Sequence, residues 1–474
     1  MLRVLALAGS GLVFTAEWLV KAFPFQPQAA AASEVPDMLA QSTAGSTMRP
    51  DPSISRSRLA LLLGGLAMFG PFSIDTIFPA FRVIARDLRV SPLLMQQTVS
   101  VYLIAYAAMA LFHGPLSDAY GRRRVILTGV AVFALATIGC ALSQDIGQLL
   151  LFRALQGLSA GVGLIVGRAV IRDCLDGDDA QRMMSSITMI FGIAPALAPV
   201  IGGWVLGWQG WQAIFWFLLL FACVLWTITF VALPETHLPD SRIAFRPSTL
   251  LHNARTMLGN PTFVRLAVSG TLCFNALFLY IASAPAFVQD LMGLNERQYV
   301  WFFAPAIGGM MLGAFVSGRM AGRMRGVRLA NIGFACGGAA VLVNIGYNVF
   351  AHDLHPPVFA LFGKHLLLPL AVLPVMAIAF GIALVFPILT LALLDMYPRQ
   401  RGAAASMQAF VGLVLNALVA GVLSPLLSGS GMHLALASSA FTAGGWLLWR
   451  GYARSSTARV DAPVEAAALE PTEL

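Results

Sequence analysis

Two ionisable residues in this sequence stand in surroundings where they could move a proton. Asp75 lies in the apolar run SIDTIFPAF, and Arg153 lies in LFRALQG, with Gln156 and Gly157 following at short offsets. A charged side chain among membrane-spanning apolar residues is a candidate functional group because its burial is costly. Asp75 is therefore expected to bind and release a proton. The alternatives are a hydrated Asp75 at a helix end and a shallow Arg153 that extends toward the membrane surface.

A second pattern, GPLSDAYGRRR, places one acid among glycines and arginines between two apolar runs. Its key positions are Gly114, Asp118, Gly121, Arg122 and Arg123. Glycines permit a tight turn, and arginines favour the cytoplasmic side of a membrane. An ordinary basic loop would explain the arginines, but it would not explain the placed acid and glycines.

Small residues and prolines mark a third pattern, APALAPVIGGW, with a glycine shortly before it. Gly192, Pro195, Pro199, Gly202 and Gly203 would let a membrane helix bend and approach its neighbour closely. The run Gly157–Gly161 also matches the G-x-S-x-G elbow of serine hydrolases. That elbow needs a preceding strand, whereas this run lies in an apolar helix pattern, so a membrane-embedded serine hydrolase is a distant alternative.

The elements that must position these residues are membrane helices. The 474 residues are 58% hydrophobic and only 11% charged, far from the roughly 25% charged of soluble domains. The net charge of +8 is spread between apolar runs, which does not indicate nucleic-acid binding. The five cysteines lack metal-type spacing, and no metal is expected. Apolar runs of spanning length occur at 58–79, 95–116, 124–143, 148–169, 183–206, 211–233, 263–289, 298–318, 328–350, 367–394, 403–427 and 432–450.

We therefore expect an all-α polytopic membrane protein with twelve transmembrane helices in two six-helix bundles. Arginines concentrate in alternate loops, which predicts that both termini are cytoplasmic. The predicted divisions are an N-terminal extension at 1–57, disordered or preceding a true start at Met48; bundles at 58–233 and 263–452; a cytoplasmic linker at 234–262; and a disordered tail at 453–474.

The loop Gly114–Arg124 resembles the Gly-x-x-x-Asp-x-x-Gly-Arg-Arg/Lys signature of the major facilitator superfamily. A decayed copy with Gly318 and Arg319 follows in the second half and supports two repeats. The resemblance implies that Asp118 is a gate contact between the halves in the outward-facing state. Arg153, Gln156 and Gly157 match the helix 4 motif that drug exporters of this superfamily link to proton transfer. The glycines and prolines of span 5 resemble its antiporter signature, with Ala198 replacing the first glycine of that signature.

Taken in order, the motifs are similar to the branch that includes bicyclomycin and chloramphenicol exporters. This similarity implies a monomeric, proton-driven antiporter of small amphipathic drugs in the bacterial inner membrane, without a cofactor and without enzymatic activity. Its partners would be the drug, protons and the lipid bilayer. A proton symporter that imports a nutrient is the nearest alternative. Candidate residues of the substrate cavity are Tyr102, Tyr106, Asn275, Tyr280 and Asn416.

Overall fold

The structure is a computed structural model that describes residues 55–175, 177–237, 242, 245–320, 323–353, 364–397 and 400–460. The predicted N-terminal extension, including Met48, lies outside these residues except for its last three. Only residues 453–460 of the predicted tail are described, and they continue the last helix.

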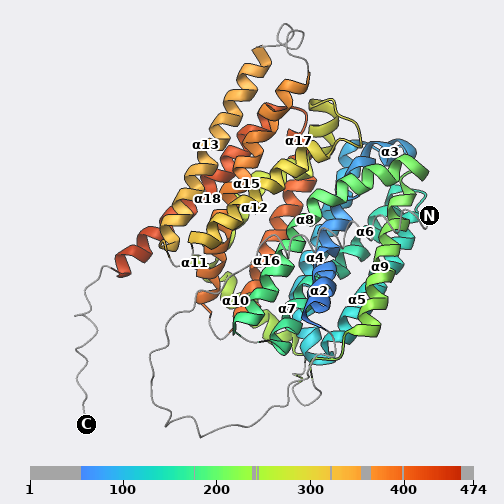
Figure 1. Cartoon of the computed structure of the whole chain (residues 1–474), viewed down its shortest axis with the longest axis vertical. Helices are drawn as coiled ribbons and strands as arrows, with labels where there is room; N and C mark the ends of the chain where they lie inside the picture. The colour runs from blue at the N-terminus through green and yellow to red at the C-terminus, as the bar shows by residue number, and fades with distance from the viewer. Residues whose placement is uncertain are drawn as a thin grey trace. The chain divides into compact units, whose positions relative to one another are not determined.

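Every regular element in these ranges is a helix (Figure 1). Apolar runs without charge form helices in a membrane protein because each main-chain hydrogen bond is then made within the segment. The first half contains α2 (Arg56–Asp75), η1 (Phe78–Ala80), α3 (Phe81–Asp87), α4 (Pro92–Tyr120), α5 (Arg122–Ala141), α6 (Ile146–Ala160), α7 (Val162–Cys174), α8 (Gly177–Gln209) and α9 (Gln212–Ala232). The rest contains α10 (Pro247–Leu258), α11 (Pro261–Ala282), η3 (Pro285–Leu291), α12 (Val300–Met320), α13 (Gly326–Asp353), α15 (Lys364–Asp395), α16 (Arg401–Leu418), η4 (Val419–Leu423), α17 (Ser424–Leu427) and α18 (Gly431–Val460).

A long helix stands at each of the twelve predicted spans. Within the described residues, eleven helices are long and apolar enough to cross a membrane. The twelfth, α18, is less apolar, since polar residues such as His433, Ser438 and Ser439 stand among its apolar ones. It nevertheless packs along α11 and α13, as a member of the bundle would. The predicted all-α membrane fold is confirmed.

Helices pack mainly within each predicted half. In the first half, α2 packs against α8, α4 against α6, and α5 against α6 and α9; in the second, α15 packs against α12 and α13, and α11 against α18. The main contacts between halves are α4 with α16 and α8 with α12. Figure 1 shows the blue-to-green helices of the first half beside the yellow-to-red helices of the second.

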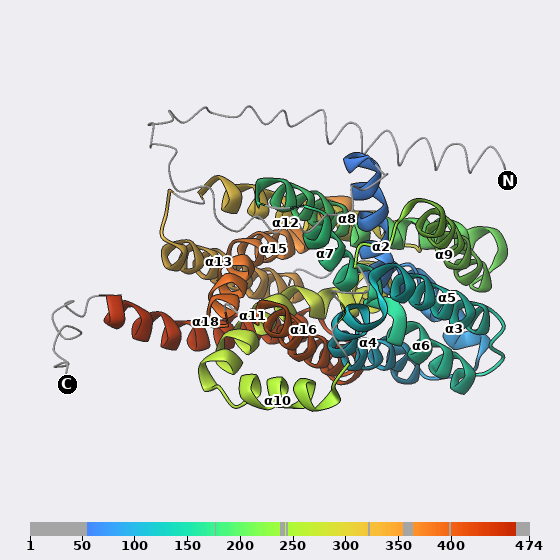
Figure 2. The same ribbon diagram turned by 90° about the horizontal axis from the view of Figure 1, so that it is seen from below.

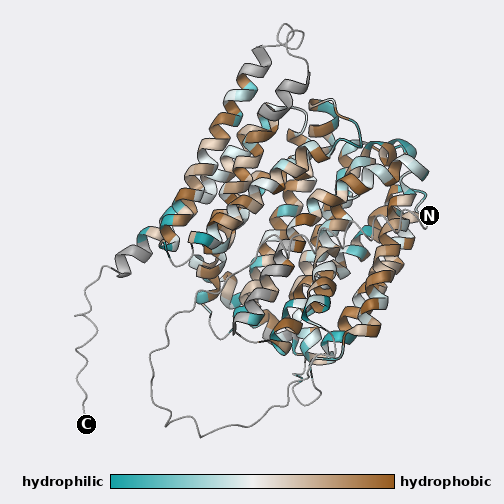
Figure 3. Ribbon diagram, in the orientation of Figure 1, coloured by the Kyte–Doolittle hydropathy of each residue, from teal (hydrophilic) through white to brown (hydrophobic). Residues whose placement is uncertain are grey.

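The predicted linker contains a helix, α10, which contacts α11 and α16 (Figure 2). Its Met257 is buried, whereas Leu251 and Leu258 are exposed. Apolar residues dominate the long helices, and hydrophilic ones gather near their ends (Figure 3). That distribution suits helices that cross an apolar layer and end in water.

Candidate functional site

Arg153 lies at the centre of a buried polar network in the first half. Its side chain is fully buried in α6, and its Nη1 donates to Gln156 Oε1 at 2.8 Å and to the carbonyl oxygen of Ser73 at 3.2 Å. The guanidinium carbon stands 4.4 Å from the centre of the Tyr102 ring. The interpretation of Arg153 as a shallow, snorkelling residue is therefore wrong.

The network joins four helices through short hydrogen bonds. Gln156 Nε2 donates to Thr137 Oγ1 of α5 at 2.7 Å, and Ser73 Oγ of α2 donates to the Tyr102 hydroxyl of α4 at 2.6 Å. No carboxylate pairs with Arg153 among the described residues, where its Nη2 also lacks a partner. Carbonyl dipoles and the face of Tyr102 therefore hold a buried cation that usually requires an acid.

Asp75 ends α2 and is also buried, with 4% of its surface exposed. In the described part of the chain, its carboxylate makes no recorded hydrogen bond or ion pair. Arg153 reaches the same helix two residues earlier, at the Ser73 carbonyl. The structure thus brings both predicted residues to one segment of α2 but not into a direct pair.

The loop with Asp118 is fastened to the end of α7 and to the residues after α9. Arg122 pairs with Asp118, its Nε donates to Asp173 Oδ2 at 3.0 Å, and its main-chain N–H donates to Glu235 Oε1 at 2.8 Å. Gly121 has a φ of 98°, and a side-chain carbon there would collide with the Glu235 carboxylate. These contacts join the first half to the start of the predicted linker, and among the described residues no hydrogen bond or ion pair joins Asp118 to the second half.

Removing Arg122 would leave two carboxylates without their shared cation. We expect Arg122→Gln to lower the free energy of unfolding by about 1–3 kcal/mol. Thermal unfolding of the purified protein, followed by tryptophan fluorescence, measures the change. Arg124→Gln is the matched control because Arg124 is exposed on the same turn and should change stability by less than about 0.5 kcal/mol. Equal losses in both variants would contradict a fastening role for Arg122.

The two halves meet through hydrogen bonds at the opposite end of the helices, which we call the closed end. Gln96 Nε2 of α4 donates to the Ala282 carbonyl at 2.8 Å and to Ser424 Oγ at 2.7 Å. Gln97 Nε2 donates to the Gly421 carbonyl at 2.8 Å, and Ser100 Oγ donates to the Ala417 carbonyl at 2.8 Å. Side-chain donors of α4 therefore bind three main-chain carbonyls and one serine hydroxyl of the second half.

A second group of contacts completes the closed end. Gln289 Nε2 donates to the Pro79 carbonyl at 3.4 Å, the Tyr299 hydroxyl donates to the Phe78 carbonyl at 3.4 Å, and Arg82 pairs with Asp290. Burial raises the pKa of Tyr299, so its hydroxyl stays protonated and able to donate. Gln289 and Asp290 belong to the π-helix η3, and Gly421 belongs to the π-helix η4, a backbone form common at functional sites.

Glycines of α8 permit close packing at this end. A side-chain carbon on Gly202 would collide with the Thr76 carbonyl oxygen, and one on Gly203 would collide with the Glu296 carbonyl oxygen. Pro195 and Pro199 lie inside the same helix, whereas a side-chain carbon on Gly192 would meet nothing within 4 Å. Of these glycines, Gly203 thus makes a close contact between the halves.

Four of the five predicted cavity residues divide into hydrogen-bonded and unpartnered side chains, and the fifth, Tyr106, is placed by its ring contacts. Tyr102 belongs to the Arg153 network, and the Tyr280 hydroxyl accepts a hydrogen bond from Asn344 Nδ2 at 2.6 Å. In contrast, both amide atoms of Asn275 and the Oδ1 of Asn416 are buried without a partner among the described residues. The Tyr106 ring lies between Gly70 and Gly161.

Two intramembrane residues were missed by the sequence prediction, His113 and Arg168. His113 of α4 is 2% exposed, and its Nδ1 has no partner within the described ranges. Arg168 is exposed although it lies inside the span Ile146–Cys174. The rule that selected Asp75 and Arg153, an ionisable group inside an apolar run, also selects these two.

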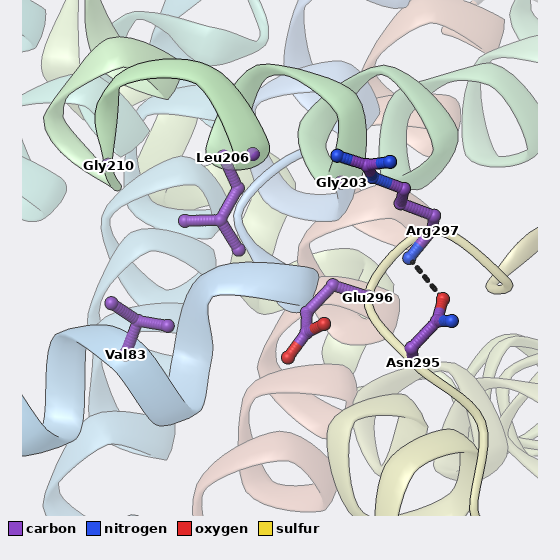
Figure 4. A pocket seen from close by; sticks show the side chains of 8 residues that line it. Val83, Gly203, Leu206, Gly210, Asn295, Glu296 and Arg297 are labelled. Atoms are coloured by element: carbon purple, nitrogen blue, oxygen red, sulfur yellow. Dashed lines mark hydrogen bonds between the residues drawn. The ribbon is translucent and has the colours of Figure 1, made fainter.

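One pocket of about 490 Å³ lies beside the closed end (Figure 4). The lining residues include Val83, Gly203 and Leu206 on one side and Glu296 and Arg297 on the other. The main-chain N–H of Arg297 donates to Asn295 Oδ1 at 3.0 Å. The pocket adjoins the Gly203 contact rather than the Arg153 network.

The run Gly157–Gly161 is not a nucleophile elbow. It lies at the end of α6, and the Ser159 hydroxyl donates to the Gln156 carbonyl at 3.0 Å. A side-chain carbon on Gly157 would collide with the Tyr102 carbonyl oxygen of α4. Gly157 therefore serves close helix packing.

Comparisons with known proteins agree with this geometry. A family model described as Major Facilitator Superfamily matches residues 61–420. The bicyclomycin resistance protein homolog of Haemophilus influenzae is 30% identical over 58% of this chain and 69% of that protein. The multidrug resistance protein MdtL of Escherichia coli O139:H28 is 29% identical over 55% of this chain and 65% of that protein. The crystal structure of a D-xylose-proton symporter has a TM-score of 0.62 at 13% identity and covers 82% of this chain and 97% of that one.

Proposed function

Since this chain belongs to the major facilitator superfamily, we propose that it exports small amphipathic drugs from the cell in exchange for protons. Family membership makes the chain a transporter and not an enzyme. The names of the bicyclomycin and multidrug resistance relatives support drug export. The symporter among the similar structures shares only the fold, so it does not favour import.

Asp75 carries the proposal of proton coupling. It is a buried carboxylate without a recorded partner in the described residues, and it directly precedes Thr76, whose carbonyl contacts Gly202 of α8. Protonation of Asp75 would neutralise a charge next to the contact between Thr76 and Gly202. The same helix, α8, meets the second half at Gly203 in the closed end. In the proposed cycle, a proton from outside displaces the drug, and its release inside permits the next drug to bind.

The remaining parts of the proposal concern placement. A monomer would reside in the bacterial inner membrane with both termini cytoplasmic, its halves at 58–233 and 263–452 joined by 234–262. The end with Arg122, Arg123 and Arg124 would then face the cytoplasm, as the preference of arginine for that side supports. The closed end would face outside, and the state described here would be open inward. The proton gradient would drive transport without a cofactor.

Everted membrane vesicles test the proposal. With a preset pH gradient, acid inside, adding a transported drug outside the vesicle should dissipate the gradient, and the drug should accumulate inside. Vesicles from the same host without the chain are the control. A symporter would instead carry the drug and protons out together, so drug loaded inside would leave faster when the gradient is imposed. That result, or no drug-dependent proton flux across a broad drug panel, would overturn the proposal.

A further inference from the structure

Arg168 is a charged residue deep inside a membrane span, where an unpaired charge is costly. It lies six residues before the end of the span Ile146–Cys174, roughly 9 Å along the helix from Cys174. An arginine exposed at such a depth costs a few kcal/mol if it faces lipid. No carboxylate pairs with it in the part of the chain that the structure describes. Its charge must therefore be met by water or by a ligand.

The direction of the side chain argues against escape to the membrane surface. Side chains on a helix tilt toward its N-terminus, so that of Arg168 leans away from the end where Asp173 binds Arg122. Arg168 lies two turns after Gly161 and therefore on the same face of the span, and Gly161 stands next to Tyr106 and His113 of α4. Helix α4 in turn packs against α16 of the second half. Arg168 thus faces a helix that lies between the halves.

An unpartnered polar atom lies on this face, and others lie in the second half, closer to the closed end. The Tyr106 ring and His113 Nδ1 both approach the position that a side-chain carbon on Gly161 would occupy, His113 at 3.3 Å. In the second half, Gly412 of α16 lies beside Thr271 of α11. Asn416 and Asn275 follow these two by one turn on helices that run in the same direction. Their amides are therefore at one level, and both amide atoms of Asn275 and the Oδ1 of Asn416 lack partners among the described residues.

The charged residues inside the spans indicate whether a ligand at Arg168 would be a cation or an anion. In the eleven described spans, Asp75 is the one acid more than two residues from a span end, whereas Arg82, Arg153, Arg168 and Arg265 are the arginines that deep. Arg82 already pairs with Asp290, and Arg153 is fully buried. An amphipathic cation would meet an unpaired guanidinium at Arg168, whereas an acidic group would form charge-assisted hydrogen bonds with it.

We propose that Arg168 binds the acidic group of an amphipathic organic anion, with Tyr106 and His113 beside it. This inference deepens the proposed export function and rests on it for the direction of transport. The acidic group of the ligand would lie against α4 and α7, and its apolar body would extend toward α16, which packs against α4 from the second half.

Binding to the purified full-length chain tests this assignment with three probes that share one body: phenylbutyrate, phenylbutanamide and phenylbutylammonium. Quenching of tryptophan fluorescence measures each dissociation constant. Wild type should bind phenylbutyrate at least about tenfold tighter than the amide because a charge-assisted hydrogen bond is gained. Arg168→Gln should remove that preference, and Arg168→Lys should retain part of it.

Arg172→Gln is the matched control because it removes the same charge one turn along the helix and should keep the preference. Tightest binding of the ammonium probe, equal binding of all three probes, or a preference that survives in Arg168→Gln would overturn the assignment. Failure of the export function looks different: the anion preference would be present, yet the probe would not dissipate a pH gradient in vesicles.

Discussion

Replacing Asp75 with asparagine is expected to abolish proton-coupled exchange while leaving the protein folded. The amide has the size of the carboxylic acid but cannot take up and release a proton. Because Asp75 has no recorded partner within the described residues, the substitution breaks no observed hydrogen bond. We expect drug-dependent proton flux in proteoliposomes to fall by about 100-fold or more, in the range seen for loss of a positioned proton-transfer group.

The control for this experiment is Asp87→Asn. Asp87 ends α3 in the same span and accepts a hydrogen bond from Trp211 Nε1 at 2.9 Å, so its role in the structure is accounted for. This variant should retain coupled exchange. Drug binding by Asp75→Asn, measured without a gradient, should stay within about threefold of wild type. Full exchange activity in Asp75→Asn would show that another group carries the proton.

The sequence predicts the membrane helices well because hydropathy alone decides them. The predicted spans at 124–143 and 211–233 correspond to α5 (Arg122–Ala141) and α9 (Gln212–Ala232), with ends shifted by at most two residues. Span 1 is less simple, since α2 ends at Asp75 and a bend leads into η1 at Phe78. The predicted span at 58–79 runs through this bend because apolar residues continue after Asp75 and Thr76.

Whether a contact of the candidate site could be predicted depends on how far apart its residues lie in the sequence. The bond between Arg153 and Gln156 joins residues three apart on one helix and follows from the helical period. The hydrogen bond between Arg122 and Asp173 joins two helices, and no local sequence pattern predicts it. Both Arg153 and Asp75 are predicted to take part in proton transfer, whereas the structure places the Ser73 carbonyl, and not the Asp75 carboxylate, at Arg153. A main-chain acceptor leaves no mark in a sequence because every residue carries one.

The contacts of the closed end could not be predicted from the sequence for the same reason. Gln96, Gln97 and Ser100 are unremarkable polar residues at the start of a span, yet their partners are carbonyl groups of the second half. Glycines in span 5 were predicted to permit close packing, but which glycine meets which carbonyl depends on the docking of the halves. The structure distinguishes Gly203, which meets Glu296, from Gly192, which meets nothing within 4 Å.

The contrast between Gly203 and Gly192 predicts a large effect of substitution at the contact between the halves. Gly203→Ala adds a side-chain carbon that would collide with the Glu296 carbonyl oxygen. Overpacking of this kind costs about 1–3 kcal/mol, which shifts an equilibrium between two conformations by about 5- to 150-fold. The cost falls on the state whose closed end is shut, so Gly203→Ala should favour the state in which that end is open.

A cysteine at Ser100 reports the shift, because the Ser100 hydroxyl is buried against Ala417 when this end is shut. The five native cysteines are first replaced, and a membrane-impermeant maleimide is added from the outer side. Labelling should accelerate by about 5-fold or more in Gly203→Ala. Gly192→Ala should label like the parent, since it adds the same carbon to the same helix where nothing lies within 4 Å.

Gly202→Ala separates a shift in conformation from simple loss of folding. Its added carbon would collide with Thr76, the residue after α2, so the clash lies inside the first half and should lower the melting temperature in both conformations. Gly203→Ala should accelerate labelling more for the same loss of melting temperature, because its clash is relieved when the halves separate. If both variants follow one relation between melting temperature and labelling rate, Gly203 is a packing residue and not part of the closure between halves.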